Sequence, residues 1–279
     1  MTRHHRTLST TTFDLIDRYA TSWLLPPTVL CATRALIFLY AFATILFLLL
    51  WDTAHGNAKA ARQSFSFFTN LTFWGIAFYF AFAAAHTGSY AFRGQSWLSR
   101  WPRALQEMHG VFYSTVVVFP FLVTIVFWAL LYSSFPTPYV TWRNVSTHAL
   151  NSVFALLEII VPRTEPMPWW HLIPLIILLA MYLGVAFVTY ATQGFFVYGF
   201  LDWRSSSGGA VAGYVVGILA AMCVLFVIVR YSIWVRVWAT EKKWGMTGKR
   251  SARESRRQLH SYASPSKDTE MASFMNNVR

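Results

Sequence analysis

Charged side chains are scarce in this chain. Only 12% of its 279 residues are Asp, Glu, Lys or Arg, whereas soluble domains carry roughly 25%. Hydrophobic residues make up 56% of the sequence and gather in long runs. The composition therefore excludes an ordinary soluble domain and indicates an integral membrane protein.

Cysteine is nearly absent as well. Two residues, Cys31 and Cys223, cannot form a disulfide framework. No Cys or carboxylate is spaced with a histidine in the manner of a metal site, so we expect neither metal nor cofactor. The first 22 residues are polar and lack the apolar centre of a signal peptide, so we expect no cleaved leader.

Six apolar segments follow one another along the chain, at 31–51, 67–87, 109–132, 145–162, 172–193 and 211–238. Most have the ~20 residues that a helix needs to cross the hydrocarbon core. Because they are six short apolar segments without the alternation of a β-strand, they cannot form a barrel, and they predict an all-α bundle of about six transmembrane helices. Segment 145–162 is the least apolar of the six.

The basic residues are unevenly distributed. Residues 1–30 form a polar N-terminal arm, and residues 239–279 form a basic tail that we predict to be disordered. Most of the positive charge falls on the side of these two ends, which predicts that both termini are cytosolic. The opposite side carries Lys59, Arg62, Arg143 and Arg204. The membrane is expected to be the endoplasmic reticulum or the plasma membrane.

The net charge of +12 also raises the question of partners. No nucleic-acid-binding motif accompanies the basic tail, so we expect no nucleic acid. Positive charge beside the last span instead favours attraction to anionic membrane lipids.

Polar residues recur inside three of the apolar segments. At ~100° per residue they share one helix face in each segment, which predicts a cavity lined partly by Thr69, Tyr79, Ser152 and Tyr182. The alternative is that these groups are packing contacts, since Ser and Thr often hydrogen-bond to a carbonyl or a neighbouring helix.

Depth in the membrane singles out two of these residues. Thr72 lies ~8 Å and His148 ~5 Å from the non-cytosolic ends of their segments, at 1.5 Å per residue. A hydroxyl and an imidazole at one level are the minimum for a nucleophile and its base. A second histidine group, His86, His109 and His171, lies near the cytosolic ends and is a weaker candidate for haem or metal.

Four short segments carry a family resemblance. They are FTNLTFWG at 68–75, STHALNS at 146–152, FALLE at 154–158 and FVYGFLD at 196–202. Together they resemble the androgen-induced protein family, most closely a fungal branch, over about residues 34–238. Gly199 replaces the family's usual proline.

The resemblance implies a multipass hydrolase of fatty acid esters of hydroxy fatty acids, with Thr72 as nucleophile and His148 as base. A lipid substrate would then enter laterally from the bilayer. Asn151 is a candidate oxyanion donor, and Asp202 is a candidate to orient His148. Glu158 lies ten residues, or ~15 Å, beyond His148 on the same helix, which is too far to assist it.

Two other classes of protein remain open. One is a non-enzymatic transporter or lipid-binding protein. Pro120 and Pro174, which interrupt apolar segments, favour a transporter, whereas the absence of an internal sequence repeat counts against one. The other is a haem protein that uses His86 with His109 or His171.

Overall fold

A computed structural model describes residues 17–134 and 136–246. Most of the predicted N-terminal arm and of the predicted disordered tail lies outside these described residues. The described ranges fold into helices and contain no β-strand, apart from an isolated bridge between Ser22 and Pro162. The prediction of an all-α protein is confirmed.

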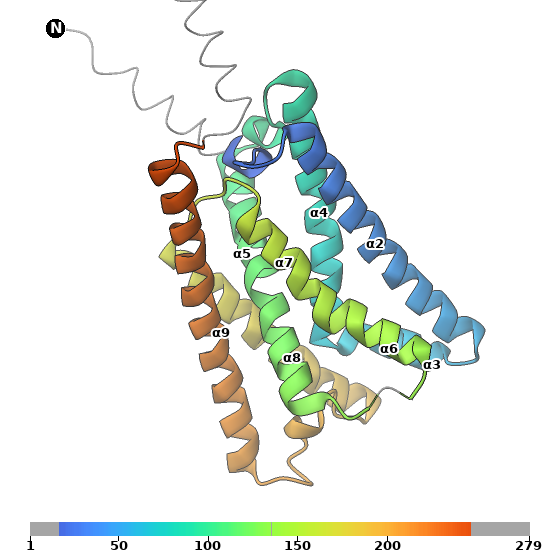
Figure 1. Ribbon diagram of the computed structural model, residues 1–279. Coiled ribbons are helices and arrows are strands. Elements are labelled where there is room, and N and C mark those ends of the chain that lie inside the picture. Colours follow the sequence, from blue (N-terminus) through green and yellow to red (C-terminus); the bar gives the residue numbers. More distant parts are fainter. Residues whose placement is uncertain (1–16, 135, 247–279) are drawn as a thin grey trace, which may run out of the picture.

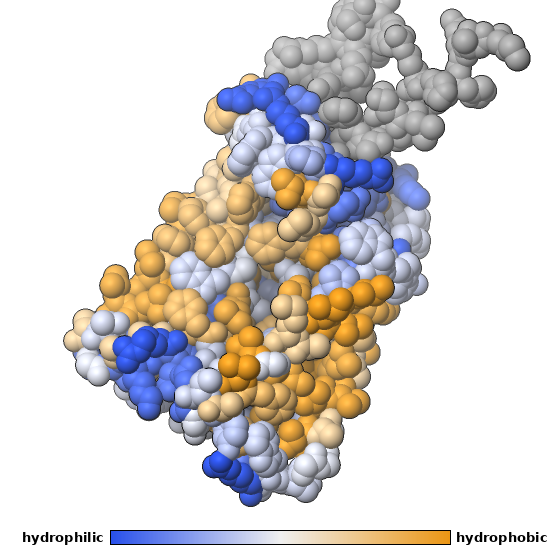
Figure 2. Space-filling model, turned by 180° about the vertical axis from the view of Figure 1, so that it is seen from behind, coloured by the Kyte–Doolittle hydropathy of each residue, from blue (hydrophilic) through white to orange (hydrophobic). Residues whose placement is uncertain are grey.

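Within the described ranges, five helical segments are long and apolar enough to cross a membrane. They are α2 (Pro27–Ala54), α4 (Phe68–Arg93), α5 (Arg103–Val126) continued by η4 (Phe127–Leu131), η6 (Trp169–His171) with α8 (Leu172–Gln193), and α9 (Gly208–Val237) continued by η8 (Trp238–Lys243). They are compatible with a multipass integral membrane protein. On the face shown in Figure 2, hydrophobic residues cover most of the middle of the bundle and hydrophilic residues gather toward its two ends.

The segment predicted at 145–162 is not among these five. It belongs to a continuous helical run made of α6 (Pro138–Val145), η5 (Ser146–Leu150) and α7 (Asn151–Ile160). The run is antiparallel to α5, because Thr124 bonds the His148 carbonyl at 2.8 Å while Tyr113, three turns earlier, bonds Thr164 at 2.9 Å. The run therefore follows the bundle from one end to the other, and α7 passes in front of α5 in Figure 1.

Short elements connect the long helices. They are η1 (Arg18–Ala20), α3 (Ala58–Gln63), η2 (Ser64–Ser66), η3 (Trp97–Arg100) and η7 (Gly199–Leu201). Helix α2 begins at Pro27, earlier than the predicted boundary, since proline fits the first helical position. Helices α4 and α8 each end at a glycine with positive φ, Gly94 and Gly194, a conformation that other residues adopt at a cost.

The interior of the bundle is apolar. Its fully buried centre includes Ile76 and Phe80 from α4, Val117 from α5 and Phe226 from α9. Figure 1 shows α2 beside α4, then α5, and α9 at the opposite edge. Helices are expected in a hydrocarbon environment because their backbone N–H and C=O groups form hydrogen bonds within the same segment.

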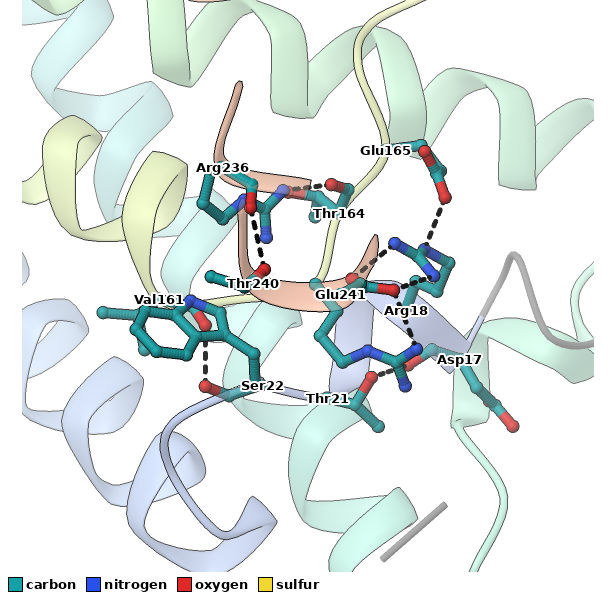
Figure 3. A network of polar contacts seen from close by, with 12 residues as sticks. Asp17, Arg18, Thr21, Ser22, Val161, Thr164, Glu165, Arg236, Thr240 and Glu241 are labelled. Carbon is teal, nitrogen blue, oxygen red and sulfur yellow. Dashed lines mark hydrogen bonds and ion pairs between the residues drawn. The ribbon is translucent and has the colours of Figure 1, made fainter. Parts of the chain in front are cut away.

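A polar network joins both described ends of the chain at one end of the bundle. Glu241 accepts two bonds from Arg18, at 2.7 and 2.9 Å, and one from Arg163 at 3.1 Å. Arg236 donates to the Thr164 carbonyl beside it (Figure 3). The first and last described residues therefore lie on the same side, and Arg18 is a buried part of the bundle rather than of a free arm.

Candidate active site

Thr72 lies in the second turn of α4 and faces the interior of the bundle. Phe68, one turn earlier, packs edge-on against Phe119 of α5 at 5.2 Å, and Ile76, one turn later, is fully buried. The Thr72 hydroxyl donates to the carbonyl of Thr69 at 2.9 Å, a local bond typical of threonine in helices. Thr72 itself is half-buried, so its hydroxyl is not sealed in the core.

His148 lies in η5, a π-helical segment, and packs on a second one. Its ring stacks on Phe127 of η4 with 3.6 Å between centroids and 3° between planes. Its buried Nδ1 has no hydrogen-bond partner among the described residues. π-Helical turns are rare and frequently occur at functional sites. A neutral imidazole in this position has a nitrogen available for a proton.

The turn that carries Thr72 and the segment that carries His148 face each other. Their sequence neighbours Phe73 and Thr147 line one small pocket together with Asn70 and Trp74. Ser146, in turn, bonds Tyr40 of α2 at 2.8 Å, which holds η5 in the bundle. Thr72 and His148 themselves do not line this pocket, and no hydrogen bond joins them within the described ranges.

An apolar cavity of about 160 Å³ opens beside this turn of α4. It lies between the start of α4, the second half of α5, the first half and middle of α8, the η7 region and the first half of α9. The residues that line it include Phe68, Thr69, Leu122, Val126, Tyr182, Tyr198 and Ile218. Thr69 and Tyr182 therefore stand where we predicted a cavity, and Thr69 is one turn from Thr72.

Tyrosines form the polar part of the cavity wall. Tyr182 donates to the Ser66 carbonyl at 3.0 Å, and the hydroxyl of Tyr198 accepts from the backbone N–H of Phe68 at 3.2 Å. Burial raises the pKa of Tyr198, which lies in the loop after α8, so its phenol is neutral. The cavity is thus mostly apolar, and a hydrocarbon group matches its lining better than a charged group does.

The predicted supporting residues have other partners. The Asn151 amide bonds Thr124 at 3.1 Å and the Pro120 carbonyl at 3.5 Å, and the Ser152 hydroxyl bonds the same two residues. Both side chains thus connect α7 to the proline position of α5, and neither lines the cavity. Asp202 accepts from the backbone N–H of Arg204 at 2.8 Å, and no contact between Asp202 and His148 occurs among the described residues.

Tyr79, which we expected in the cavity, instead belongs to a buried ionic site. Its hydroxyl donates to Glu158 at 3.2 Å. Glu158 in turn accepts two bonds from the Arg34 guanidinium, at 2.7 and 2.8 Å, and both charged side chains are at most 2% exposed. Arg34 also donates to the Tyr19 carbonyl at 2.7 Å and to Thr87 at 2.5 Å. Charge buried in a membrane helix needs this kind of pairing.

No family model, curated protein or solved structure matches this chain. The resemblance to the androgen-induced protein family therefore stays a prediction from four short segments.

His86 and His109 of the second histidine group are packed too tightly against each other to hold a haem between them. The rings of His86 and His109 meet edge to face with 5.0 Å between centroids, and His109 also stacks on Tyr79 at 5.7 Å. A porphyrin does not fit between imidazoles in direct contact. Within residues 17–134 and 136–246, no group of three or more His, Cys, Asp or Glu side chains is placed to hold a metal ion.

Sequence reasoning missed two contacts. One is the Arg34–Glu158 pair: Arg34 lies near the beginning of α2 and Glu158 near the end of α7, and both residues lie at the same end of the bundle. The other joins Ser114 Oγ and His171 Nδ1 at 2.7 Å. A Cβ at Gly110 would stand 3.3 Å from the His171 ring, so this glycine admits the ring. Ser114 is completely buried, which closes the pair to substrate.

Proposed function

We propose that this protein is an intramembrane lipid ester hydrolase with Thr72 as nucleophile and His148 as base. The observation that carries the proposal is the apolar cavity beside the α4 turn that holds Thr72. An acyl chain in this cavity would lie within one helical turn of the hydroxyl.

The reaction would proceed in two acyl-transfer steps. Thr72 Oγ attacks the ester carbonyl and its proton passes to the His148 imidazole, which returns it to the departing alkoxide as the C–O bond breaks. Water then attacks the acyl-threonine, and His148 takes the water proton and returns it to Thr72. Rotation of the Thr72 side chain must first break its bond to the Thr69 carbonyl.

The surroundings of His148 support its role as the base. The parallel Phe127 ring fixes the plane of the imidazole, and the unpartnered Nδ1 leaves it free to accept a proton. The neighbouring core of the bundle is buried and apolar, and a polar interaction is stronger in such a low-dielectric site than in water.

The proposal includes a topology. The α6–η5–α7 run is taken as a sixth crossing, since α5 ends and α8 begins at opposite ends of the bundle. Both termini are placed in the cytosol because most basic residues lie on their side. The cavity then lies in the non-cytosolic leaflet, in the endoplasmic reticulum or the plasma membrane.

The substrate class proposed is the fatty acid esters of hydroxy fatty acids. The resemblance of the four short segments to the androgen-induced protein family favours this class. The two hydrocarbon arms of these esters suit an apolar site that a lipid reaches from the bilayer. A panel of lipid esters, offered to the purified full chain in nanodiscs, is the direct test.

Thr72→Ala and His148→Ala should each abolish hydrolysis and leave folded protein, and the double variant should lose little more because the two act as a unit. Thr115→Ala is the matched control. Thr115 is also half-buried, and its hydroxyl makes the same local bond, to the Phe112 carbonyl at 2.7 Å. Undiminished hydrolysis by Thr72→Ala would contradict the assignment.

A non-catalytic lipid-binding protein is the second candidate. It is favoured by the Thr72 hydroxyl being bonded within its own helix. Retention of a lipid ester by the protein, with no hydrolysis of any ester in the panel, would decide for this alternative.

A further inference from the structure

A groove on the outer surface of the bundle adjoins the apolar cavity. It has a volume of about 460 Å³ and lies between the end of α5, with η4, and the first half of α9. Its walls are Ile125, Val126, Ala129 and Leu130 on one side and Ala210, Gly213, Tyr214, Gly217, Ile218 and Ala221 on the other. Val126 and Ile218 line both the groove and the cavity, so the two spaces lie next to each other.

We infer that this groove is the outer part of the acyl-chain binding site and sets the length of chain that the protein accepts. The inference rests on the proposed function, because it takes the cavity as the place where the chain approaches Thr72. The occupant is the distal hydrocarbon of a long-chain lipid ester.

Volume is the first argument. Pockets for small ligands usually enclose about 300–1,000 Å³, and the cavity alone, at about 160 Å³, is smaller than that. A long acyl chain that begins in the cavity must therefore continue beyond it. The groove is the adjoining space of sufficient size.

Position is the second argument. The groove runs along α5 and α9, both long and apolar enough to cross a membrane, and its walls are exposed hydrophobic side chains such as Ile125 and Tyr214. An open apolar channel on such a surface faces lipid rather than water. A chain in it stays in contact with the bilayer.

The groove is open because α9 has glycine, which lacks a side chain, at positions 213 and 217. An added Cβ at Gly213 or Gly217 meets no atom within 4 Å, and each glycine has an ordinary helical conformation, since neither is among those with positive φ. Leucine at Gly217 therefore fits the fold, is the better helix former, and fills the groove. Gly184 of α8 also has nothing within 4 Å of an added Cβ and is exposed, but it lies outside the groove. It provides a matched control.

The test uses the full chain in nanodiscs and two fatty acid esters, one long and one short, each with a diazirine at the end of its acyl chain. The long probe should label groove residues such as Ile125 and Tyr214, located by mass spectrometry. Gly217→Leu should lower labelling by the long probe at least fivefold and leave labelling by the short probe unchanged. Gly184→Leu should change neither, and a Gly217→Ala, Leu, Phe series should show a graded loss.

Each remaining outcome has a distinct meaning. Long-probe labelling of Gly217→Leu at the native level would overturn the groove assignment, whether or not the protein hydrolyses esters. Native labelling of the groove without hydrolysis would overturn the proposed catalysis and leave the groove as a lipid site. A native dimer that Gly217→Leu converts to a monomer would show that a second copy occupies the groove, because glycines four residues apart also admit a neighbouring helix. That result too would overturn the inference.

Discussion

The guanidinium of Arg34 and the carboxylate of Glu158 form a two-point ion pair inside the bundle, 124 residues apart in sequence. The pair joins α2 to α7. Tyr79 and Thr87 of α4 extend it to a third helix, and the Tyr19 carbonyl adds the segment before α2. An isolated charge at this position would be costly. Each of the two residues therefore needs the opposite charge of the other.

Breaking this pair should destabilise the protein strongly. Glu158→Gln leaves the Arg34 charge buried without a counter-charge, which typically costs about 3–5 kcal/mol. Removing both charges, as in Arg34→Met with Glu158→Leu, should restore much of the loss because no charge is then left unpaired. The difference in stability is measured by unfolding both variants in detergent with increasing temperature or denaturant concentration. A single variant as stable as the native protein would show that the pair contributes nothing to stability.

The Glu241 network should hold the first described residues against the end of α9. Glu241→Gln removes the negative charge shared by Arg18 and Arg163. We expect faster amide hydrogen exchange in residues 18–22 and 161–165, where Arg163 N–H bonds the Thr21 carbonyl. The control is Lys242→Gln, which changes an exposed neighbour. Equal exchange in the two variants would refute this role.

Phe127 is predicted to position the His148 imidazole. Phe127→Leu removes the parallel ring 3.6 Å away and allows the imidazole to tilt. A misplacement of about 1 Å can cost up to 10²-fold in rate, so kcat for a hydrolysed ester should fall while KM changes little. Steady-state kinetics distinguishes this from a loss of binding, in which KM would rise instead.

The orientation in the membrane can be tested by cysteine labelling. With Cys31 and Cys223 replaced by serine, Lys59→Cys in α3 and Lys242→Cys in η8 are compared. A membrane-impermeant maleimide applied to intact cells or sealed vesicles should reach the two cysteines from opposite sides, with Lys242→Cys accessible from the cytosol. The reverse pattern would move the cavity to the cytosolic leaflet.

The distribution of apolar residues was sufficient to predict the helical membrane bundle and the approximate position of its segments. It also predicted that polar residues of the second and fifth segments face a cavity, and Thr69 and Tyr182 do line one. The helix face of a residue can be predicted in this way because it follows directly from residue spacing, at ~100° per residue.

Only the tertiary structure decided which polar atoms meet. Tyr79 is directed to Glu158 rather than to the cavity, and Asn151 and Ser152 bond the Pro120 carbonyl rather than face a substrate. Spacing within one helix gives the face on which a residue lies, but it does not give the neighbour that this face meets. That neighbour depends on how the helices are arranged about one another, and the arrangement is set by packing and by buried pairs such as Arg34 and Glu158, whose members come from distant parts of the chain.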